Sequence, residues 1–305
     1  MKGMKKMLYV IAGAALLFIT ACVLLAGFIT GGRRQTFDEA LNWQSERYDT
    51  SFYGSSEKVS YTVQGDGGYI LNVQLLKAPQ DSSRYVIITH GITDNRMGSL
   101  KYARLYRELG FNCIIYDLRG HGENVKTSTT YGMKEGRDLA LLTEDTRMRY
   151  PDITVLGLHG ESLGAASTVM SLKYSPRVDF AVADCGFSDI ENVLRSGVKS
   201  LRMPGFLVDM QNLGLMIRYG CSFKDMRPVD ALEGSTIPVM FIHGGDDRLI
   251  SPRNSEDMYE AARSYKEIHI IPGAEHAVSA IVAPDKYLEY LKSFIERVTD
   301  NEEPC

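Results

Sequence analysis

Hydrophobic and polar positions repeat along this chain with two periods, and together they predict a sheet with helices between its strands. Residues 58–64 and 69–76 alternate as two strands would, and the glycine-rich stretch 65–68 between them predicts a hairpin turn. From residue 84 onward, short apolar runs of strand length alternate with segments of helical spacing. The expected later strands are 84–89, 111–116, 153–158, 178–183, 238–242 and 267–271, and the expected helices are 100–109, 134–150, 252–265 and 285–298. This order predicts an α/β fold with a mostly parallel sheet covered on both faces.

The first 34 residues follow neither period. Residues 8–30 carry no charge, and as a helix these 23 residues would reach about 35 Å, whereas a bilayer core is about 30 Å thick. Three lysines and the amino terminus precede this stretch, and two arginines follow it. The excess of positive charge before the stretch favours an N-terminus inside the cell and a main domain outside it. We therefore expect a single-pass protein of the cell membrane, held by an uncleaved signal anchor.

A cleaved signal is the competing interpretation of the same stretch. Residues 19–22, which end in Cys22, resemble a bacterial lipobox, in which the cysteine would become the lipidated first residue. Residues 23–29 remain apolar, however, where a lipoprotein normally turns polar, so an anchor is the better interpretation. The expected organisation is an anchor at 1–34, a linker at 35–57 and one domain at 58–305.

Composition narrows the class of protein. A chain of 305 residues is long enough for one large α/β domain or two small ones, and 44% hydrophobic and 24% charged residues are typical of an ordinary globular protein. The net charge of −4 argues against a nucleic-acid partner, which requires a clustered basic face. The five cysteines and six histidines show no spacing typical of metal ligands, so neither a metal nor a cofactor is expected. Cys113 and Cys185 lie in apolar runs and are expected to be buried free thiols.

The strand expected at 153–158 leads into the sequence Gly160-Glu161-Ser162-Leu163-Gly164, which has the pattern G-x-S-x-G. In this arrangement, a strand is followed by a sharp turn and a helix, and the serine at the apex of the turn is presented above the sheet. A side chain at either glycine would collide with a neighbouring strand or helix. The helix that follows directs free N–H groups and its positive end towards the position of a developing oxyanion. The pattern predicts a nucleophilic serine, although many glycine-rich turns hold a serine without a chemical role.

Two later loops supply candidates for an acid and a base. The loop after strand 238–242 contains Asp246 and Asp247, and a carboxylate at this place can orient an imidazole. His276 lies on the loop after strand 267–271, just before the last helix. The resulting order of serine, aspartate and histidine is the one that such a strand–turn–helix serine requires. The other histidines (His90, His121, His159, His243 and His269) lie at strand ends, at turns or inside a strand, where we expect structural roles.

With His90-Gly91 and the motif Asp117-x-Arg119-Gly120-His121-Gly122, these features make the chain from about residue 59 onward resemble the α/β-hydrolase superfamily. It looks most like membrane-anchored bacterial serine hydrolases that are related to cinnamoyl-esterase-type proteins. The resemblance implies an α/β-hydrolase fold. The segment at about 186–235 is rich in flexible apolar side chains, which a helical cap inserted over the sheet would explain.

The same resemblance implies a role for particular residues. It makes Ser162 the nucleophile, Asp247 rather than Asp246 the acid, and His276 the base. The backbone N–H groups of Ile92 and Leu163 would then form the oxyanion hole. Within the cap, Phe206 and Met210 are expected to line a pocket for the acyl part of the substrate, although most apolar cap residues would serve packing.

The sequence therefore predicts a serine hydrolase that cleaves a small-molecule carboxylic ester or thioester through an acyl-enzyme. A serine peptidase or an acyltransferase would use the same three residues and differs in the leaving group or the acceptor. A catalytically silent, membrane-anchored binding protein with this fold is the third alternative, because a fold alone does not prove activity. The sequence leaves the natural substrate and the oligomeric state open.

Overall fold

The computed structural model describes residues 2–299 and contains two compact units. The larger one, here called the α/β unit, comprises Arg33–Asp189 and the chain from Arg227 onward. The smaller one, here called the helical unit, combines Met1–Gly32 with Ile190–Met226. The N-terminal helix and the inserted segment, which are far apart in the sequence, therefore belong to the same unit.

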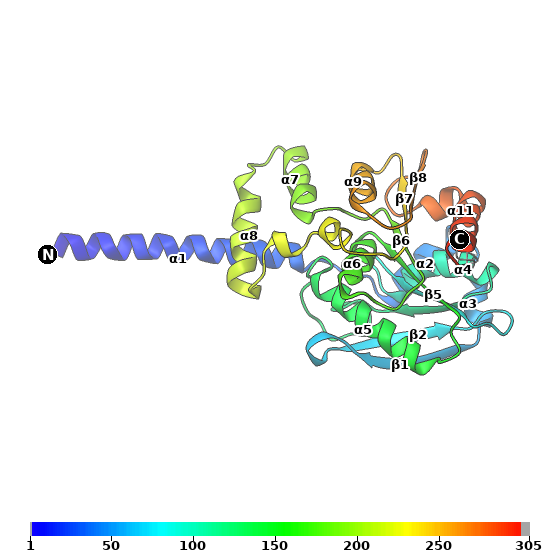
Figure 1. The fold of residues 1–305 in the computed structure, drawn as a ribbon. Coiled ribbons are helices and arrows are strands. Elements are labelled where there is room, and N and C mark those ends of the chain that lie inside the picture. Colours follow the sequence, from blue (N-terminus) through cyan, green and yellow to red (C-terminus); the bar gives the residue numbers. More distant parts are fainter. Residues whose placement is uncertain (1, 300–305) are drawn as a thin grey trace. The chain divides into compact units, whose positions relative to one another are not determined.

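The α/β unit is built around a sheet of eight strands in the order β1-β2-β4-β3-β5-β6-β7-β8 (Figure 1). β2 pairs antiparallel with both β1 and β4, and the remaining neighbours are parallel. The strands are β1 (Lys58–Gln64), β2 (Ile70–Leu76), β3 (Arg84–Thr89), β4 (Asn112–Tyr116), β5 (Val155–Glu161), β6 (Phe180–Asp184), β7 (Val239–Gly244) and β8 (Lys266–Ile271). The predicted fold class, a mostly parallel sheet with two opening antiparallel strands, is confirmed.

Helices cover both faces of this sheet. One face packs against α2, α4, α10 and α11 in a single hydrophobic cluster that includes Val86 and Ile88 of β3. On the other face, α5 packs closely on α6, and a Cβ at Gly136 of α5 would collide with Ser167 and Met170 of α6. The helices of the α/β unit, which also include α3 and α9, are α2 (Phe37–Ser45), α3 (Ser51–Ser55), α4 (Leu100–Glu108), α5 (Met133–Arg149), α6 (Leu163–Ser171), α9 (Arg253–Ala261), α10 (Ser279–Val282) and α11 (Pro284–Thr299).

Two expected elements end three or more residues away from the predicted position. β5 does not stop at residue 158 but continues to Glu161, because Gly160 and Glu161 pair with Ala183 and Asp184 of β6. The helix expected at 252–265 ends at Ala261, where the next residue is already extended. The hairpin between β1 and β2 is present, and Gly67 and Gly68 of its turn have φ angles of 65° and 79°, which favour glycine.

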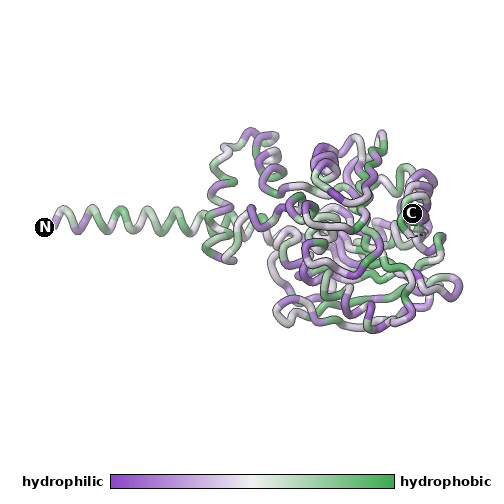
Figure 2. The backbone as a smooth tube through the Cα atoms, in the orientation of Figure 1, coloured by the Kyte–Doolittle hydropathy of each residue, from purple (hydrophilic) through white to green (hydrophobic). Residues whose placement is uncertain are grey.

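The helical unit consists of α1 (Lys2–Thr30), α7 (Ile190–Ser200) and α8 (Phe206–Tyr219), followed by a 3₁₀ turn. Among the described residues, α1 alone is long and apolar enough to cross a membrane, and it is predominantly hydrophobic along its length (Figure 2). Its buried residues, Cys22, Ala26 and Thr30, all lie in its last third. Arg195 of α7 forms ion pairs with Glu191 and with Asp209, which joins α7 to α8.

Candidate active site

Ser162 lies at the turn between β5 and α6, in a backbone conformation that is rare for a residue with a side chain. Its φ is 54° and its ψ is −114°, and strain of this kind costs about 1–3 kcal/mol and concentrates at functional sites. The two glycines of the motif permit the turn, because a Cβ at Gly160 would collide with the carbonyl of Gly164, and one at Gly164 with the carbonyl of Thr89. The turn is also fixed by the Ser162 N–H, which donates to the Asp184 carbonyl at 2.8 Å.

The structure brings the three predicted residues together at the carboxyl ends of β5, β7 and β8. The Nε2 atom of His276 lies 3.0 Å from the Oγ atom of Ser162. On the other side of the ring, Nδ1 lies 2.6 Å from Oδ2 of Asp247. This geometry lets the imidazole accept the serine proton while the carboxylate fixes the tautomer with a proton on Nδ1.

Asp247 is held in place by four contacts and is buried. Its Oδ1 accepts the N–H groups of Leu249 and Ile250, each at 2.9 Å. Its Oδ2 is also 3.2 Å from Nε2 of His243, a histidine that was expected to have a structural role. Burial acts to raise the pKa of Asp247, but the hydrogen bonds from His243 and His276 outweigh it and hold the pKa below its usual range. The carboxylate therefore stays charged opposite His276.

The other carboxylates near these strand ends have different partners. The side chain of Asp246 is exposed, and its N–H donates to the Ala274 carbonyl at 2.9 Å. Asp184 lies 2.9 Å and 3.0 Å from the hydroxyls of Tyr102 and Tyr287, and burial raises its pKa to about 6. Of these carboxylates, Asp247 is the one within hydrogen-bond distance of His276.

The loop after β3 brings Gly91, the residue before Ile92, close to Ser162. A Cβ added at Gly91 would lie 3.7 Å from the Cβ of Ser162. His90 accepts the Leu118 N–H at Nε2 over 2.9 Å, so its Nδ1–H donates to the Gly91 carbonyl at 2.7 Å. Nε2 of His121 lies 2.6 Å from the Ile92 carbonyl and fixes the same loop.

Burial favours the uncharged form of both histidines. Burial lowers the pKa of His90 well below its ordinary value and lowers the pKa of His121 to about 4. In the described part of the chain, the N–H groups of Ile92 and Leu163 donate to no protein acceptor, and Leu163 is the first residue of α6. Two N–H groups without a protein acceptor, one directly after Ser162 and one on the loop that follows β3, are what an oxyanion hole requires.

The motif from Asp117 to Gly122 builds the loop that carries His121. The Asp117 carboxylate accepts the N–H groups of Arg96 and Glu123 at 2.9 Å and 3.0 Å, and it pairs with the Arg96 guanidinium at 2.6 Å. Arg119 forms a two-pronged pair with Asp138, at 2.9 Å and 2.7 Å. These charged residues therefore act through the loop, and through His121 they support the position of Ile92.

A buried ion pair that the sequence analysis did not identify joins the turn of Ser162 to the loop of His276. The ammonium of Lys101 lies 2.5 Å from Glu161 and donates to the Ala277 carbonyl at 3.0 Å. Burial acts to lower the pKa of Lys101, but the charge of Glu161 outweighs it and raises the pKa. The hydroxyl of Tyr102 lies 2.7 Å from the same carboxylate. In the sequence, the only indication of this ion pair is a lysine between Leu100 and Tyr102 at the start of an amphipathic helix. No local pattern identifies Glu161 as its partner.

Replacing Lys101 with methionine is expected to lower the free energy of unfolding by about 3–5 kcal/mol, because Glu161 would remain buried without its cation. It should also lower kcat, because the carbonyl next to His276 loses its donor. The double variant Lys101→Met/Glu161→Gln should recover part of the stability, and the exposed Lys126→Met is the matched control. Urea denaturation of the four proteins measures the effect. A loss for Lys101→Met no larger than that of the control would contradict a structural role for the pair.

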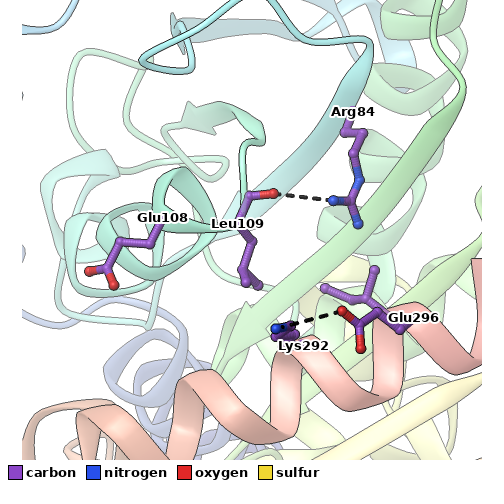
Figure 3. A pocket seen from close by; sticks show the side chains of 6 residues that line it. Arg84, Glu108, Leu109, Lys292 and Glu296 are labelled. Atoms are coloured by element: carbon purple, nitrogen blue, oxygen red, sulfur yellow. Dashed lines mark hydrogen bonds and ion pairs between the residues drawn. The ribbon is translucent and has the colours of Figure 1, made fainter.

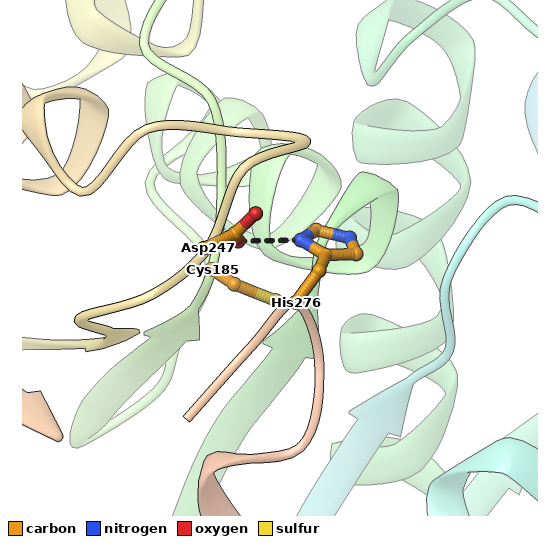
Figure 4. Close-up of side chains that lie close together, drawn as sticks. All are labelled: Cys185, Asp247 and His276. Atoms are coloured by element: carbon orange, nitrogen blue, oxygen red, sulfur yellow. Dashed lines mark hydrogen bonds and ion pairs between the residues drawn. The ribbon is translucent and has the colours of Figure 1, made fainter. Parts of the chain in front are cut away.

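The thiol of Cys185 lies close to the side chains of Asp247 and His276 (Figure 4). One potential ligand atom of each of these residues lies within 4.8 Å of the others. The oxygens of Asp247 are already engaged by two histidines and two backbone N–H groups, and burial raises the pKa of the Cys185 thiol well above its ordinary value. A protonated thiol and an occupied carboxylate do not fit a metal centre. Cys113 and Cys185 are both buried and free, as the sequence predicted.

A separate pocket lies at the amino end of β3, and its lining residues are drawn in Figure 3. It is lined by Arg84 at the start of β3, by the end of α4 and by α11. The guanidinium of Arg84 donates to the Leu109 carbonyl at 3.2 Å, and Lys292 pairs with Glu296 at 3.9 Å. The strand ends that carry Ser162, Asp247 and His276 are the carboxyl ends, so this pocket does not serve them.

The two residues predicted to contact the substrate lie on α8. Phe206 is 58% exposed, and Met210 is partly buried. Both belong to the helical unit. Their contact with the acyl group remains a prediction.

Comparison with protein families gives a partial match to a hydrolase family, and comparison with other sequences gives several relatives. A family model described as serine aminopeptidase, S33, matches residues 226–280, which include Asp247 and His276. The uncharacterized protein YqkD of Bacillus subtilis is 28% identical over 98% of this chain and 100% of its own length. Human protein ABHD12B is 27% identical over 65% of this chain and 57% of its own length.

Solved structures of hydrolases share the fold. An esterase from Pyrococcus furiosus superposes with a TM-score of 0.67 and 20% identity over 83% of this chain and 95% of its own. An acylaminoacyl peptidase from Pyrococcus horikoshii gives a TM-score of 0.64 and 16% identity over 87% of this chain and 44% of its own. At such low identity these likenesses establish the fold and leave the reaction open.

Proposed function

We propose that this chain, which has the α/β-hydrolase fold, is a serine hydrolase of carboxylic esters or thioesters. The observation that carries the proposal is the hydrogen-bonded series from Ser162 through His276 to Asp247, with distances of 3.0 Å and 2.6 Å. The strained backbone of Ser162 and the lowered pKa of Asp247 support it, because both are expected of an activated serine and its charge partner.

In the proposed reaction, Nε2 of His276 takes the proton of the Ser162 hydroxyl as Oγ forms a bond to the carbonyl carbon of the ester. The carbonyl oxygen becomes an oxyanion, and the N–H groups of Ile92 and Leu163 stabilise it. The carbon–oxygen bond to the alcohol then breaks, and the alcohol leaves with the proton from His276. Water repeats the sequence: His276 takes its proton, the hydroxide attacks the acyl carbon, and Ser162 leaves with that proton.

A serine peptidase is the second candidate, because the S33 aminopeptidase model and the acylaminoacyl peptidase structure are both similar to this chain. The same three residues would act, and the leaving group would be an amine instead of an alcohol. An acyltransferase would replace water with another acceptor. A silent binding protein is disfavoured, because a serine, a histidine and an aspartate stand at all three positions.

Labelling with a fluorophosphonate probe, followed by a panel of substrates, tests this proposal. The full chain should bind the probe covalently at Ser162 and should hydrolyse p-nitrophenyl esters faster than aminoacyl p-nitroanilides. Faster hydrolysis of the anilides would favour the peptidase. Absence of both labelling and hydrolysis in a folded protein would favour the binding protein.

Polar substitution of Phe206 or Met210 is expected to change the preference for acyl chain length, mainly through KM. Contacts with the acyl chain are equal in the ground state and the transition state, and such contacts alter KM more than kcat. Acetyl esters should be spared, because a short acyl group would not reach these side chains. The measurement is kcat/KM for acetyl, butyryl and octanoyl esters in Phe206→Ser, Met210→Ser and the parent. Equal losses on all three esters would mean that the two residues serve folding.

α1 would hold this enzyme on the cell membrane. Its length and hydropathy support a single-pass anchor, and the three lysines before the apolar stretch support a catalytic domain outside the cytoplasm. Protease treatment of intact cells tests the orientation. Degradation of the α/β unit is expected, and protection until the membrane is opened would reverse the proposed topology.

A further inference from the structure

Within the helical unit, α8 packs on the last third of α1 through small residues. A Cβ at Gly214 of α8 would collide with the carbonyl of Cys22 and approach the side chain of Ala26. Further along both helices, the hydroxyls of Thr30 and Tyr219 lie 3.1 Å apart. Glycine in the middle of a helix costs up to about 1 kcal/mol, and close backbone approach at small residues is how helices pack inside membranes. Gly214 is therefore explained by its contact with α1.

The length of α1 determines the depth of this contact in a bilayer. The uncharged stretch begins at Leu8, and the 14 residues from Leu8 to Ala21 reach only about 21 Å, whereas the bilayer core is about 30 Å thick. The segment that packs on α8 must supply the missing length. Gly27 lies about 28 Å along the helix from Leu8, which is close to the far boundary of the core. If α1 spans a bilayer, α8 therefore lies at the depth of the membrane leaflet that is remote from the N-terminus.

The side chains of α8 suit this position. Leu213, Met216 and Ile217 are 36%, 54% and 49% exposed, and they share one side of the helix because they are three and four residues apart. The guanidinium of Arg218 lies beside Gly27, where the boundary of the core is expected. A charged group at the boundary with apolar side chains below it is the arrangement of a helix at a membrane surface.

The chain enters and leaves the α/β unit at the strand ends that carry the candidate active site. The link after α1 is fixed by the N–H of Gln35, which donates at 2.8 Å to the carbonyl of Thr93, the residue after Ile92. The links before α7 and after the 3₁₀ turn begin at Asp189 and Arg227, which form an ion pair at 3.2 Å. Asp189 follows the end of β6 by five residues. All three links therefore leave the α/β unit at the carboxyl ends of its strands.

We propose that α8 lies in the lipid of the membrane half remote from the N-terminus, and that the enzyme acts on amphiphilic esters held in that membrane. The apolar face formed by Leu213, Met216 and Ile217 contacts lipid acyl chains. An ester dissolved in the bilayer would then be the substrate of a catalytic unit whose chain links to the membrane leave it at the strand ends of the candidate active site. The substrate class rests on the proposed hydrolase function, whereas the position of α8 does not depend on it.

Photo-crosslinking measures the position of α8 without any reference to activity. The full chain carries a photoreactive benzoylphenylalanine in place of Ile217 or, in a second protein, of Leu213, and it is reconstituted in vesicles of phosphatidylethanolamine and phosphatidylglycerol. The control carries it in place of Met148 on α5, which is 72% exposed. Lipid adducts are expected at 217 and 213 and not at 148. Absence of lipid adducts at both positions, or adducts between two copies of the chain instead, would overturn the proposal.

Kinetics of the double variant Leu213→Glu/Ile217→Glu measure the substrate class. For a long-chain ester presented in the same vesicles, kcat/KM should fall at least ~10-fold, because two apolar side chains no longer seat α8 in lipid. For a water-soluble acetyl ester, it should stay within about twofold of the parent, and Met148→Glu should change neither value. Equal losses on both esters would overturn the membrane-held substrate. A parent that hydrolyses neither ester but still gives lipid adducts would instead refute the hydrolase function and leave the position of α8 standing.

Discussion

Replacing Ser162 with alanine is expected to lower kcat for ester hydrolysis by about 10⁶-fold, the loss seen when the serine of a comparable Ser-His-Asp hydrolase is removed. The Oγ atom of Ser162 has one hydrogen-bond partner among the described residues, Nε2 of His276. Its backbone strain would be the same for alanine, since φ remains 54° in the same turn. The melting temperature should therefore stay nearly unchanged while covalent labelling by a fluorophosphonate disappears.

The matched control for this variant is Ser45→Ala, at an exposed serine at the end of α2. It should retain the labelling and the activity of the parent. If Ser162→Ala still bound the probe at another serine and hydrolysed the same esters, Ser162 would not be the nucleophile.

Replacing Asp247 with asparagine should lower kcat by about 10⁴-fold, because an amide at this position favours the wrong tautomer of the catalytic imidazole. In addition, a neutral amide cannot stabilise the positive charge that forms on His276 during the reaction. Asp246→Asn is the neighbouring control, because the side chain of Asp246 is exposed and its backbone supplies its contact with the loop of His276. The control should lose far less activity.

The measurement is kcat for a butyryl ester in both variants, with circular dichroism to confirm that each is folded. Greater loss in Asp246→Asn than in Asp247→Asn would move the acid by one position. Equal and small losses would mean that neither carboxylate orients the imidazole.

Much of the α/β unit was predictable because its signals are local. Buried parallel strands produce short apolar runs, and glycines at 160 and 164 mark a turn that tolerates no side chain. The end of β5 was not predictable in this way. Glu161 looks like a turn residue in the sequence, but it pairs with Asp184 of the neighbouring strand and its charge is met by Lys101 from α4. That pair joins residues sixty positions apart, and no periodicity encodes it.

The helical unit shows the same limit more strongly. The apolar stretch of α1 gave its length and its capacity to cross a bilayer, but it gave no partner. The contact between Gly214 and Cys22 joins the chain's first helix to one nearly two hundred residues later. Small residues in both helices are the only sign of it in the sequence, and small residues are common for other reasons.

The most direct test of the central claim is to trap the acyl-enzyme. The full chain is mixed with p-nitrophenyl butyrate, quenched in acid within the first turnover, digested and analysed by mass spectrometry. The account predicts a butyryl group on the peptide that contains Ser162, formed in step with the release of p-nitrophenol and absent from His276→Ala. Release of p-nitrophenol with no acyl group on Ser162, or with the group on a different residue, would contradict it.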